Sequence, residues 1–189
     1  MRRDNKYEKI LSVAARLISR KGYSGASLQE IANKVGLHKS SLFHYIKNKE
    51  ELLLRIFGET FQEGNRILKE ISDDHSLEPE EKLKKAIDFH LTSVEENFDS
   101  ISIFLDQIRS LPKKHQSMAL KARKKYEKSF QKIIVEMKRK GYFEGLDKQI
   151  VTLGVLGMLN WVPMWFRRDG RLTIQEISNI FYKLIVEKI

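Results

Sequence analysis

The sequence predicts an all-α protein of about nine helices. Apolar residues recur at helical spacing in nearly every long segment, and no segment shows the alternation of apolar and polar residues that is typical of a strand. Only three prolines interrupt the 189 residues, so long helices can form between them. A chain of this length can bury the core of one or two domains.

The first two helices are indicated by residues at their ends. The first is expected to end near Lys21, because Gly22 follows a basic last turn. Ser27 and Glu30 form a Ser-x-x-Glu capping box, in which the serine side chain accepts from the Glu30 amide and the glutamate accepts from the Ser27 amide. This predicts a second helix over 27–35, ended by Gly36.

A short third helix and a long fourth helix follow. The third should begin at His38 or Lys39 and end near Tyr45. Asn48, with a glutamate three residues later, predicts the start of a fourth helix that continues to about residue 72. The remaining helices are expected over residues 79–98, 100–110, 114–140, 147–167 and 173–188.

Charge is distributed unevenly along the chain. The formal net charge is +10. Residues 1–50 carry eleven basic against four acidic side chains, residues 51–100 carry six against thirteen, and residues 101–150 carry thirteen against five. The first basic block is where a polyanion would be attracted, since neutralised phosphates supply most non-specific affinity for nucleic acid.

Several functional classes lack their expected residues. The absence of cysteine excludes disulfides, thiolate zinc sites and cysteine nucleophiles. His38 and His44 are six residues apart, which suits neither a helical metal pair nor a zinc finger, so no metal site and no cofactor are expected. No Gly-rich phosphate loop or G-x-S-x-G motif indicates an enzyme. No apolar run could cross a membrane and the N-terminus is not typical of a signal peptide, so a cytoplasmic protein is expected.

The second and third helices, joined at Gly36 and Leu37, form a helix-turn-helix pattern whose third helix would enter the major groove of double-stranded DNA. Leu42 and Phe43 are expected to pack inward. Short polar side chains let a helix approach base edges closely, Lys39 can donate to guanine, and hydroxyl or ammonium groups can hold phosphates. The candidate DNA-binding residues are Ser27, His38, Lys39, Ser40, Ser41, His44, Tyr45 and Lys49.

The segment SLQEIANKVGLHKSSLFHYIKNKEELL resembles the DNA-binding signature of the tetracycline-repressor (TetR) family. Two positions depart from the family pattern: His38 stands where Ser or Thr is common, and Ser40 where Gly or Ala is frequent. Both lie on the expected reading surface and bear on operator choice. The resemblance implies a helix-turn-helix DNA-binding domain over 1–48 and a ligand-binding and dimerisation domain over 49–189. It also implies a homodimer that binds a palindromic operator, most often as a repressor released by a small-molecule effector.

The homodimer is expected to form through helices 147–167 and 173–188. The helix over 147–167 is apolar on nearly every side, so it needs cover that a second copy would supply. Gly154 and Gly157 would permit close approach. The alternative is that the last helix covers it within the chain.

The effector is expected to bind among the middle helices. The segment 160–172 is similar to that of TetR relatives that control fatty-acid or sterol breakdown and respond to acyl-coenzyme A thioesters. Aromatic side chains suit an acyl chain or adenine, and arginines suit phosphates. The candidate effector-binding residues are Phe89, His90, Phe104, Gln107, Asn160, Trp161, Trp165, Arg167 and Arg168, with Met118 and Tyr126 among further lining candidates.

Three alternatives stay open. Segment 160–172 can be a structural corner between two helices. The effector can be a lipophilic cation, as for regulators of drug efflux, with a carboxylate from Glu95, Glu96, Asp99 or Asp106. The protein can also be a sequence-independent architectural DNA-binding protein, although the acidic block over 51–100 argues against that.

Overall fold

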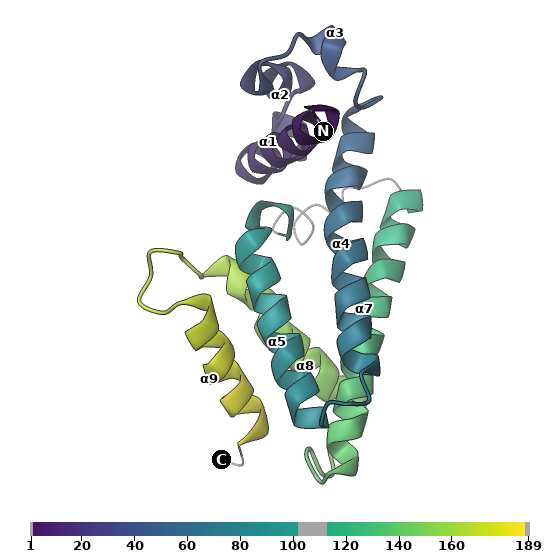
Figure 1. Ribbon diagram of the computed structural model, residues 1–189, viewed down its shortest axis with the longest axis vertical. Coiled ribbons are helices and arrows are strands. Elements are labelled where there is room, and N and C mark those ends of the chain that lie inside the picture. Colours follow the sequence, from purple (N-terminus) through teal and green to yellow (C-terminus); the bar gives the residue numbers. More distant parts are fainter. Residues whose placement is uncertain (1, 102–112, 188–189) are drawn as a thin grey trace. The chain divides into compact units, whose positions relative to one another are not determined.

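The computed structural model describes residues 2–101 and 113–187, and every regular element in these ranges is a helix, which confirms the all-α class (Figure 1). The helix expected over 100–110 lies almost entirely outside the described residues. The elements are α1 (Arg2–Gly25), α2 (Leu28–Val35), α3 (Lys39–Leu42), α4 (Lys49–Asp73), α5 (Pro79–Glu96), α7 (Lys113–Arg139), α8 (Lys148–Trp161), the 3-10 helix η2 (Val162–Met164) and α9 (Ile174–Val186).

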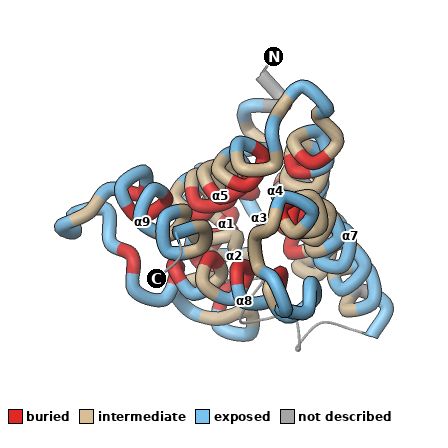
Figure 2. Tube along the Cα trace, turned by 90° about the horizontal axis from the view of Figure 1, so that it is seen from below, coloured by how far each residue is buried: buried red, intermediate tan, exposed pale blue. Residues whose placement is uncertain are grey.

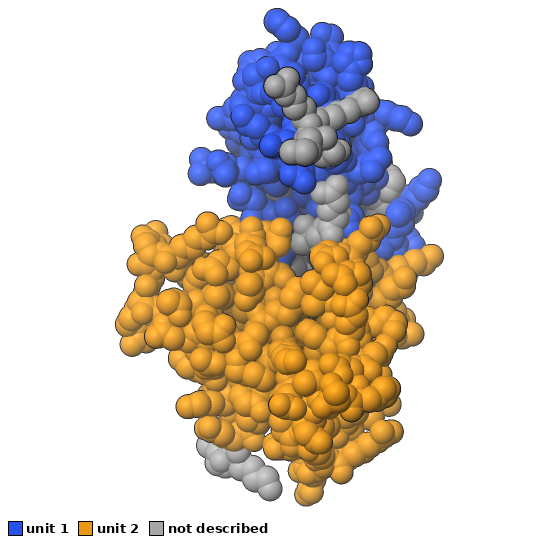
Figure 3. Space-filling view, in the orientation of Figure 1, with its two compact units in different colours: residues 1–61, 99–119 blue, residues 62–98, 120–189 orange. Residues whose placement is uncertain are grey.

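The chain divides into two compact units, which Figure 3 colours separately. The first comprises residues 1–61 and 99–119, and the second comprises residues 62–98 and 120–189. The core of the first unit is built from apolar residues of α1, α2, α3 and the first half of α4. The second unit buries apolar residues of α5, α7, α8 and α9 (Figure 2).

Local capping explains where α2 begins, with one correction. Ser27 is the N-cap, and its Oγ accepts from the Glu30 amide at 3.1 Å. The carboxylate of Glu30 pairs with Lys21 at 2.7 Å, whereas a capping box would place it on the Ser27 amide. Gly22 breaks the regular helix, as expected, with a positive φ of 72°, but one further turn continues to Gly25.

The start of α4 is capped from both sides. The Asn48 side chain accepts from the Glu51 amide at 2.7 Å, and the Glu51 carboxylate accepts from the Lys47 amide at 2.7 Å. This hydrogen bond lowers the pKa of Glu51. The predicted cap at Asn48 is confirmed, and it places the start of α4 directly after the segment 38–45 that is expected to read DNA.

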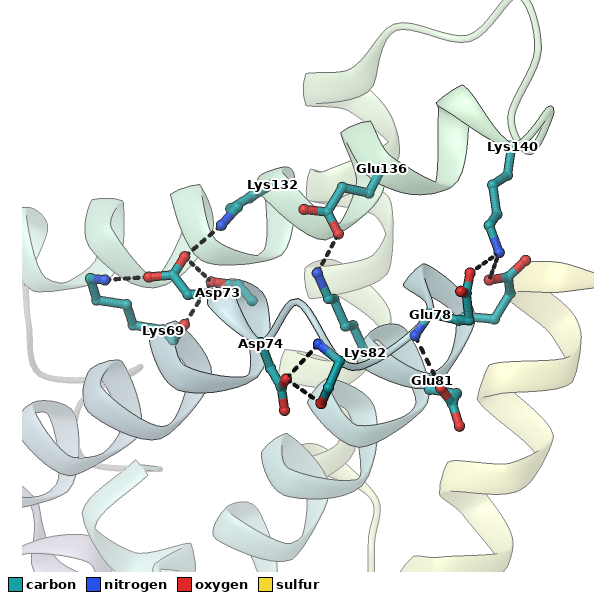
Figure 4. Close-up of polar contacts among 12 residues, drawn as sticks. Lys69, Asp73, Asp74, Glu78, Glu81, Lys82, Lys132, Glu136 and Lys140 are labelled. Atoms are coloured by element: carbon teal, nitrogen blue, oxygen red, sulfur yellow. Dashed lines mark hydrogen bonds and ion pairs between the residues drawn. The ribbon is translucent and has the colours of Figure 1, made fainter.

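Ion pairs tie the corner between α4 and α5 to α7 (Figure 4). Lys82 of α5 is 3% exposed, and its ammonium lies 2.7 Å from the carboxylate of Glu136 on α7. Asp73, at the end of α4, pairs with Lys132 of α7 at 2.6 Å and also with Lys69. These two ammonium groups hold the pKa of Asp73 well below its usual range.

The predicted boundaries of α8 and α9 need small corrections. The start of α8 at Asp147 is as expected, and Asp147 is its N-cap, but the α-helix ends at Trp161 and not near residue 167. Pro163 lies in the 3-10 helix that follows, because its ring and missing N–H do not suit the interior of an α-helix. Thr173 caps α9 in a complete capping box with Glu176.

Candidate DNA-binding surface and effector site

The turn between α2 and α3 is closed by main-chain bonds that only a left-handed residue permits. Gly36 has φ 69° and ψ 44°, and its amide donates to Asn33. The amide of Leu37 donates to the carbonyl of Ala32 at 2.9 Å. This is the usual glycine-ended closure of a helix, and it lets the chain reverse direction within two residues before α3.

The third helix presents polar residues on its exposed side. Leu42 and Ile46 are buried in the core of the first unit. Among the eight candidate DNA-binding residues, five are exposed and three are half-buried. His38, Lys39, Ser40 and His44 are exposed, as is Ser27, whereas Ser41, Tyr45 and Lys49 are half-buried.

The prediction that Phe43 packs inward is wrong, because its side chain is 46% exposed. The α-helix ends at Leu42, and the next three residues form a turn. Phe43 is four residues after Lys39 and three after Ser40, so the three share one side of this segment. Tyr45, expected beside a phosphate, packs against the core in its place.

His38 occupies the N-cap of α3, but its side chain makes no capping hydrogen bond. A serine or threonine at this position normally accepts from an amide of the first turn. The imidazole of His38 is exposed and therefore available to a partner outside the chain.

Lys49 is held by groups of its own unit. Its ammonium donates to the carbonyl of Ala26 at 2.8 Å and lies 4.3 Å from the centre of the Tyr23 ring. Burial lowers the pKa of Lys49. The ammonium therefore links the start of α4 to the segment that leads into α2.

An aromatic cluster of two buried rings and the half-buried Tyr126 joins α5 and α7 in the second unit. His90 is 8% exposed, and its Nδ1 lies 3.1 Å from the hydroxyl of Tyr126. The Phe130 ring lies edge-on to His90, with centroids 6.3 Å apart. The other ring nitrogen of His90, Nε2, is buried and has no hydrogen-bond partner among the residues that the structure describes. Burial lowers the pKa of His90 to about 4 and raises the pKa of Tyr126, so both groups are neutral at pH 7.

The remaining effector candidates that the structure describes are not brought together inside the protomer. Trp161 is 62% exposed and Trp165 is 45% exposed, so neither lines an interior slot of one chain. Arg168 donates to the carbonyl of Glu95 at the end of α5. Of the others, Arg167 is exposed, Phe89 and Asn160 are half-buried, and Phe104 and Gln107 lie outside the described residues.

The sequence did not predict two features of these sites: Phe130 in the aromatic cluster, and the exposure of Phe43. Phe130 is four residues after Tyr126 on α7, and this spacing could have placed both rings on one side of the helix. No comparable local signal separates the exposed Phe43 from the buried Leu42, since both are large and apolar and adjacent in sequence.

One side of α8 carries an apolar stripe that the protomer leaves uncovered. Val155, Leu156 and Leu159 are buried, whereas the opposite side is exposed. Among the described elements, α9 packs chiefly against α5, so it does not supply the intrachain cover considered as an alternative. The exposed apolar residues of α8, η2 and α9 include Ile150, Leu153, Trp161, Met164, Ile180 and Leu184.

Gly154 and Gly157 lie within this stripe. A Cβ added to either glycine would meet nothing within 4 Å in the protomer. The space above both glycines is open, and it would admit a second helix at close range.

Two further properties hold for the described part of the chain. It contains no group of three or more side chains placed to bind a metal ion. Its helices are all too short or too polar to span a lipid bilayer.

Comparison with family models covers most of the sequence. Residues 10–56 match the model of bacterial regulatory proteins, tetR family, and residues 76–189 match the tetracyclin repressor-like C-terminal domain. The chain belongs to the TetR family. As a member of this family it is a DNA-binding transcriptional regulator and not an enzyme, and TetR regulators bind operator DNA as dimers.

Named relatives of this TetR-family chain match it along nearly its whole length. The fatty acid metabolism regulator protein of Bacillus subtilis (strain 168) is 24% identical over 187 residues, which are 97% of this chain and 95% of that protein. The HTH-type transcriptional repressor KstR2 of Mycobacterium tuberculosis (strain CDC 1551 / Oshkosh) is 24% identical over 186 residues, 94% of this chain and 89% of that protein.

A solved structure provides the corresponding similarity in three dimensions. AibR in complex with isovaleryl coenzyme A and operator DNA superimposes with a TM-score of 0.85 at 28% identity, covering 97% of this chain and 100% of that chain.

Proposed function

We propose that this chain is a repressor that binds a palindromic operator as a homodimer and is released by a fatty acyl-coenzyme A or similar thioester. In this proposal residues 1–48 are the DNA-binding domain, and residues 49–189 bind the effector and the second copy. The uncovered stripe on α8, together with exposed apolar residues of α9, supports the dimer interface. The names of the fatty acid metabolism regulator and of the AibR complex with isovaleryl coenzyme A support the class of effector.

The choice of effector class rests on the charge of the buried polar side chains. In the described part of the second unit they are neutral or basic: Ser72, Lys82, His90, Thr152 and Ser178. A pocket for a lipophilic cation needs a buried carboxylate. Of the acidic candidates for that role, Glu96 is exposed, Glu95 and Asp99 are half-buried, and Asp106 lies outside the described residues. The buried groups therefore favour a neutral or anionic effector over a cation.

A thermal-shift panel tests the effector. Acyl-coenzyme A thioesters of increasing chain length, free coenzyme A, free fatty acids and cationic dyes are each added to the full-length protein. At a hundredfold excess over its dissociation constant, a thioester that binds should add about 2.7 kcal/mol to the free energy of unfolding. For a domain of this size that is a rise in Tm of roughly 5–10 °C. If only the cationic dyes raise the Tm, the effector is a lipophilic cation and not a thioester.

Selection from a random-sequence DNA library tests the operator. Enrichment of a palindrome with half-sites about one helical turn apart is expected for a symmetric dimer. Equal retention of all sequences would instead support the architectural alternative.

Lys39→Ala is expected to relax base preference at one position of each half-site. The Lys39 ammonium is exposed on α3, where it can donate to guanine, and losing such a contact costs roughly 1–3 kcal/mol of discrimination. Selection with the variant protein, compared with the parent, measures the change. Lys34→Ala is a charge-matched control, since Lys34 is exposed at the end of α2. If both variants bind every DNA sequence more weakly by the same factor, Lys39 does not read a base directly.

A further inference from the structure

His90 and Tyr126 form a polar pair in an otherwise apolar part of the second unit. His90 projects from α5 and Tyr126 from α7, and the hydroxyl lies 3.1 Å from Nδ1. The rings of His90, Tyr126 and Phe130 contact one another, with centroid distances from 5.6 to 6.3 Å. Nε2 of His90 is buried, and no hydrogen-bond partner for it lies in the described ranges 2–101 and 113–187.

We propose that Nε2 of His90 is an N–H donor for a carbonyl oxygen of the effector, and that Tyr126 holds the imidazole in this tautomer. The inference rests on the proposed function, because it assigns the group of a thioester effector that this part of the unit would recognise. It concerns the contact that distinguishes a thioester from a ligand that has the same chain but no carbonyl oxygen.

Proton counting determines which ring nitrogen carries the hydrogen. A phenol is a better proton donor than an imidazole N–H, and an unprotonated imidazole nitrogen is a better acceptor than a phenol oxygen. In the proposed arrangement the Tyr126 hydroxyl therefore donates to Nδ1, which lies 3.1 Å away. A neutral imidazole has one N–H, so that hydrogen lies on Nε2. Burial lowers the pKa of His90, which keeps the ring neutral at pH 7.

A buried N–H without an acceptor is unfavourable, and buried polar groups nearly always have a partner. A carbonyl oxygen of the effector would supply the acceptor. A lipophilic cation without an acceptor oxygen would leave the N–H unpaired. A free fatty acid would bring a full negative charge against a neutral ring in apolar surroundings, which is unfavourable without a compensating charge. The His90–Tyr126 pair therefore favours a thioester effector over a lipophilic cation and over a free fatty acid.

The test removes the carbonyl oxygen from the ligand and, separately, the N–H donor of His90 from the protein. The probes are octanoyl-coenzyme A and its thioether analogue S-octyl-coenzyme A, which has the same chain without the carbonyl oxygen. The parent protein should bind the thioester about tenfold more tightly than the thioether, as expected for one buried hydrogen bond. His90→Phe should bind both equally, and His90→Gln, which keeps an N–H, should recover part of the preference.

If His90→Phe prefers the thioester over the thioether as strongly as the parent protein does, the inference is overturned, but a thioester effector is not. Failure of the parent protein to bind either probe or any other thioester would overturn the proposed effector class and this contact together. The ¹⁵N spectrum of the His90 imidazole in the unsubstituted protein gives a measurement that needs no variant. Its Nε2–H form is expected at pH 7. As a separate measurement, Tyr126→Phe should lose this preference. An Nδ1–H form would overturn the donor role.

Discussion

Replacing Gly157 with leucine is expected to convert the protein from a dimer into a monomer and to weaken operator binding roughly a hundredfold. Gly157 lies on the exposed side of α8, in the stripe that contains Leu153 and Trp161. The three positions are four residues apart, so they lie on one side of the helix. A side chain at residue 157 would keep a second helix from approaching closely.

The protomer itself should tolerate this substitution. A Cβ at residue 157 meets nothing within 4 Å, and leucine has a higher helix propensity than glycine by nearly 1 kcal/mol. A loss of dimer would therefore reflect the interface and not the fold. Separate monomers lose the advantage of two linked half-site contacts, which is typically worth a factor of 10² to 10⁴ in affinity.

Sedimentation velocity measures the association state, and fluorescence anisotropy with a selected palindromic duplex measures DNA binding. Leu153→Glu and Leu153→Arg should both dissociate the dimer, although they change the charge in opposite directions. Leu120→Glu is the matched control, because Leu120 is a 52% exposed leucine on α7 and lies outside the stripe. An unchanged dimer in Gly157→Leu and in both Leu153 variants would exclude this side of α8 as the interface.

Glu136→Leu is expected to lower the free energy of unfolding by about 3 kcal/mol, because it leaves the ammonium of Lys82 buried without its partner. Lys82 is 3% exposed, and its side chain lies between α5 and α7. The side chain of Glu136 is 19% exposed, so water reaches part of the pair, and the expected loss stays at the lower end for a buried ion pair. In a domain of this size the loss corresponds to a fall in Tm of roughly 6–12 °C.

The double variant Lys82→Met with Glu136→Leu should regain most of the stability. It removes both charges and fills the space with apolar atoms, which is often neutral for a buried pair. Urea unfolding at fixed protein concentration measures all three proteins. Glu63→Gln is the control, because Glu63 pairs with Arg66 on the exposed surface of α4 and no measurable change is expected. A Glu136→Leu protein as stable as the control would mean that the buried ammonium is hydrated.

The sequence was sufficient to predict most helix starts. Ser27, Asn48, Asp147 and Thr173 each cap the helix expected to follow. A cap depends on a side chain and an amide two or three residues apart, so the determining residues are adjacent in sequence. The family resemblance rested on the same stretch of local signals, and the match over residues 10–56 confirms it.

The candidate sites were predicted less completely. Phe43 was expected inside and is 46% exposed, because the helix ends one residue before it. Trp161 and Trp165 were expected to line the effector site, yet both are exposed in the protomer. Side-chain direction after a helix end depends on how the next segment packs, and residue type alone does not predict it.

The sequence by itself determined the helical class, the helix-turn-helix and the basic segment that bears it, because periodicity, caps and charge are local properties. Only the tertiary structure decided which polar groups meet. His90 and Tyr126 are 36 residues apart, and Lys82 and Glu136 are 54 residues apart. It also decided which side of α8 is left uncovered. Contacts of that kind depend on how whole helices pack, and many sequences with the same helical pattern would pair different residues.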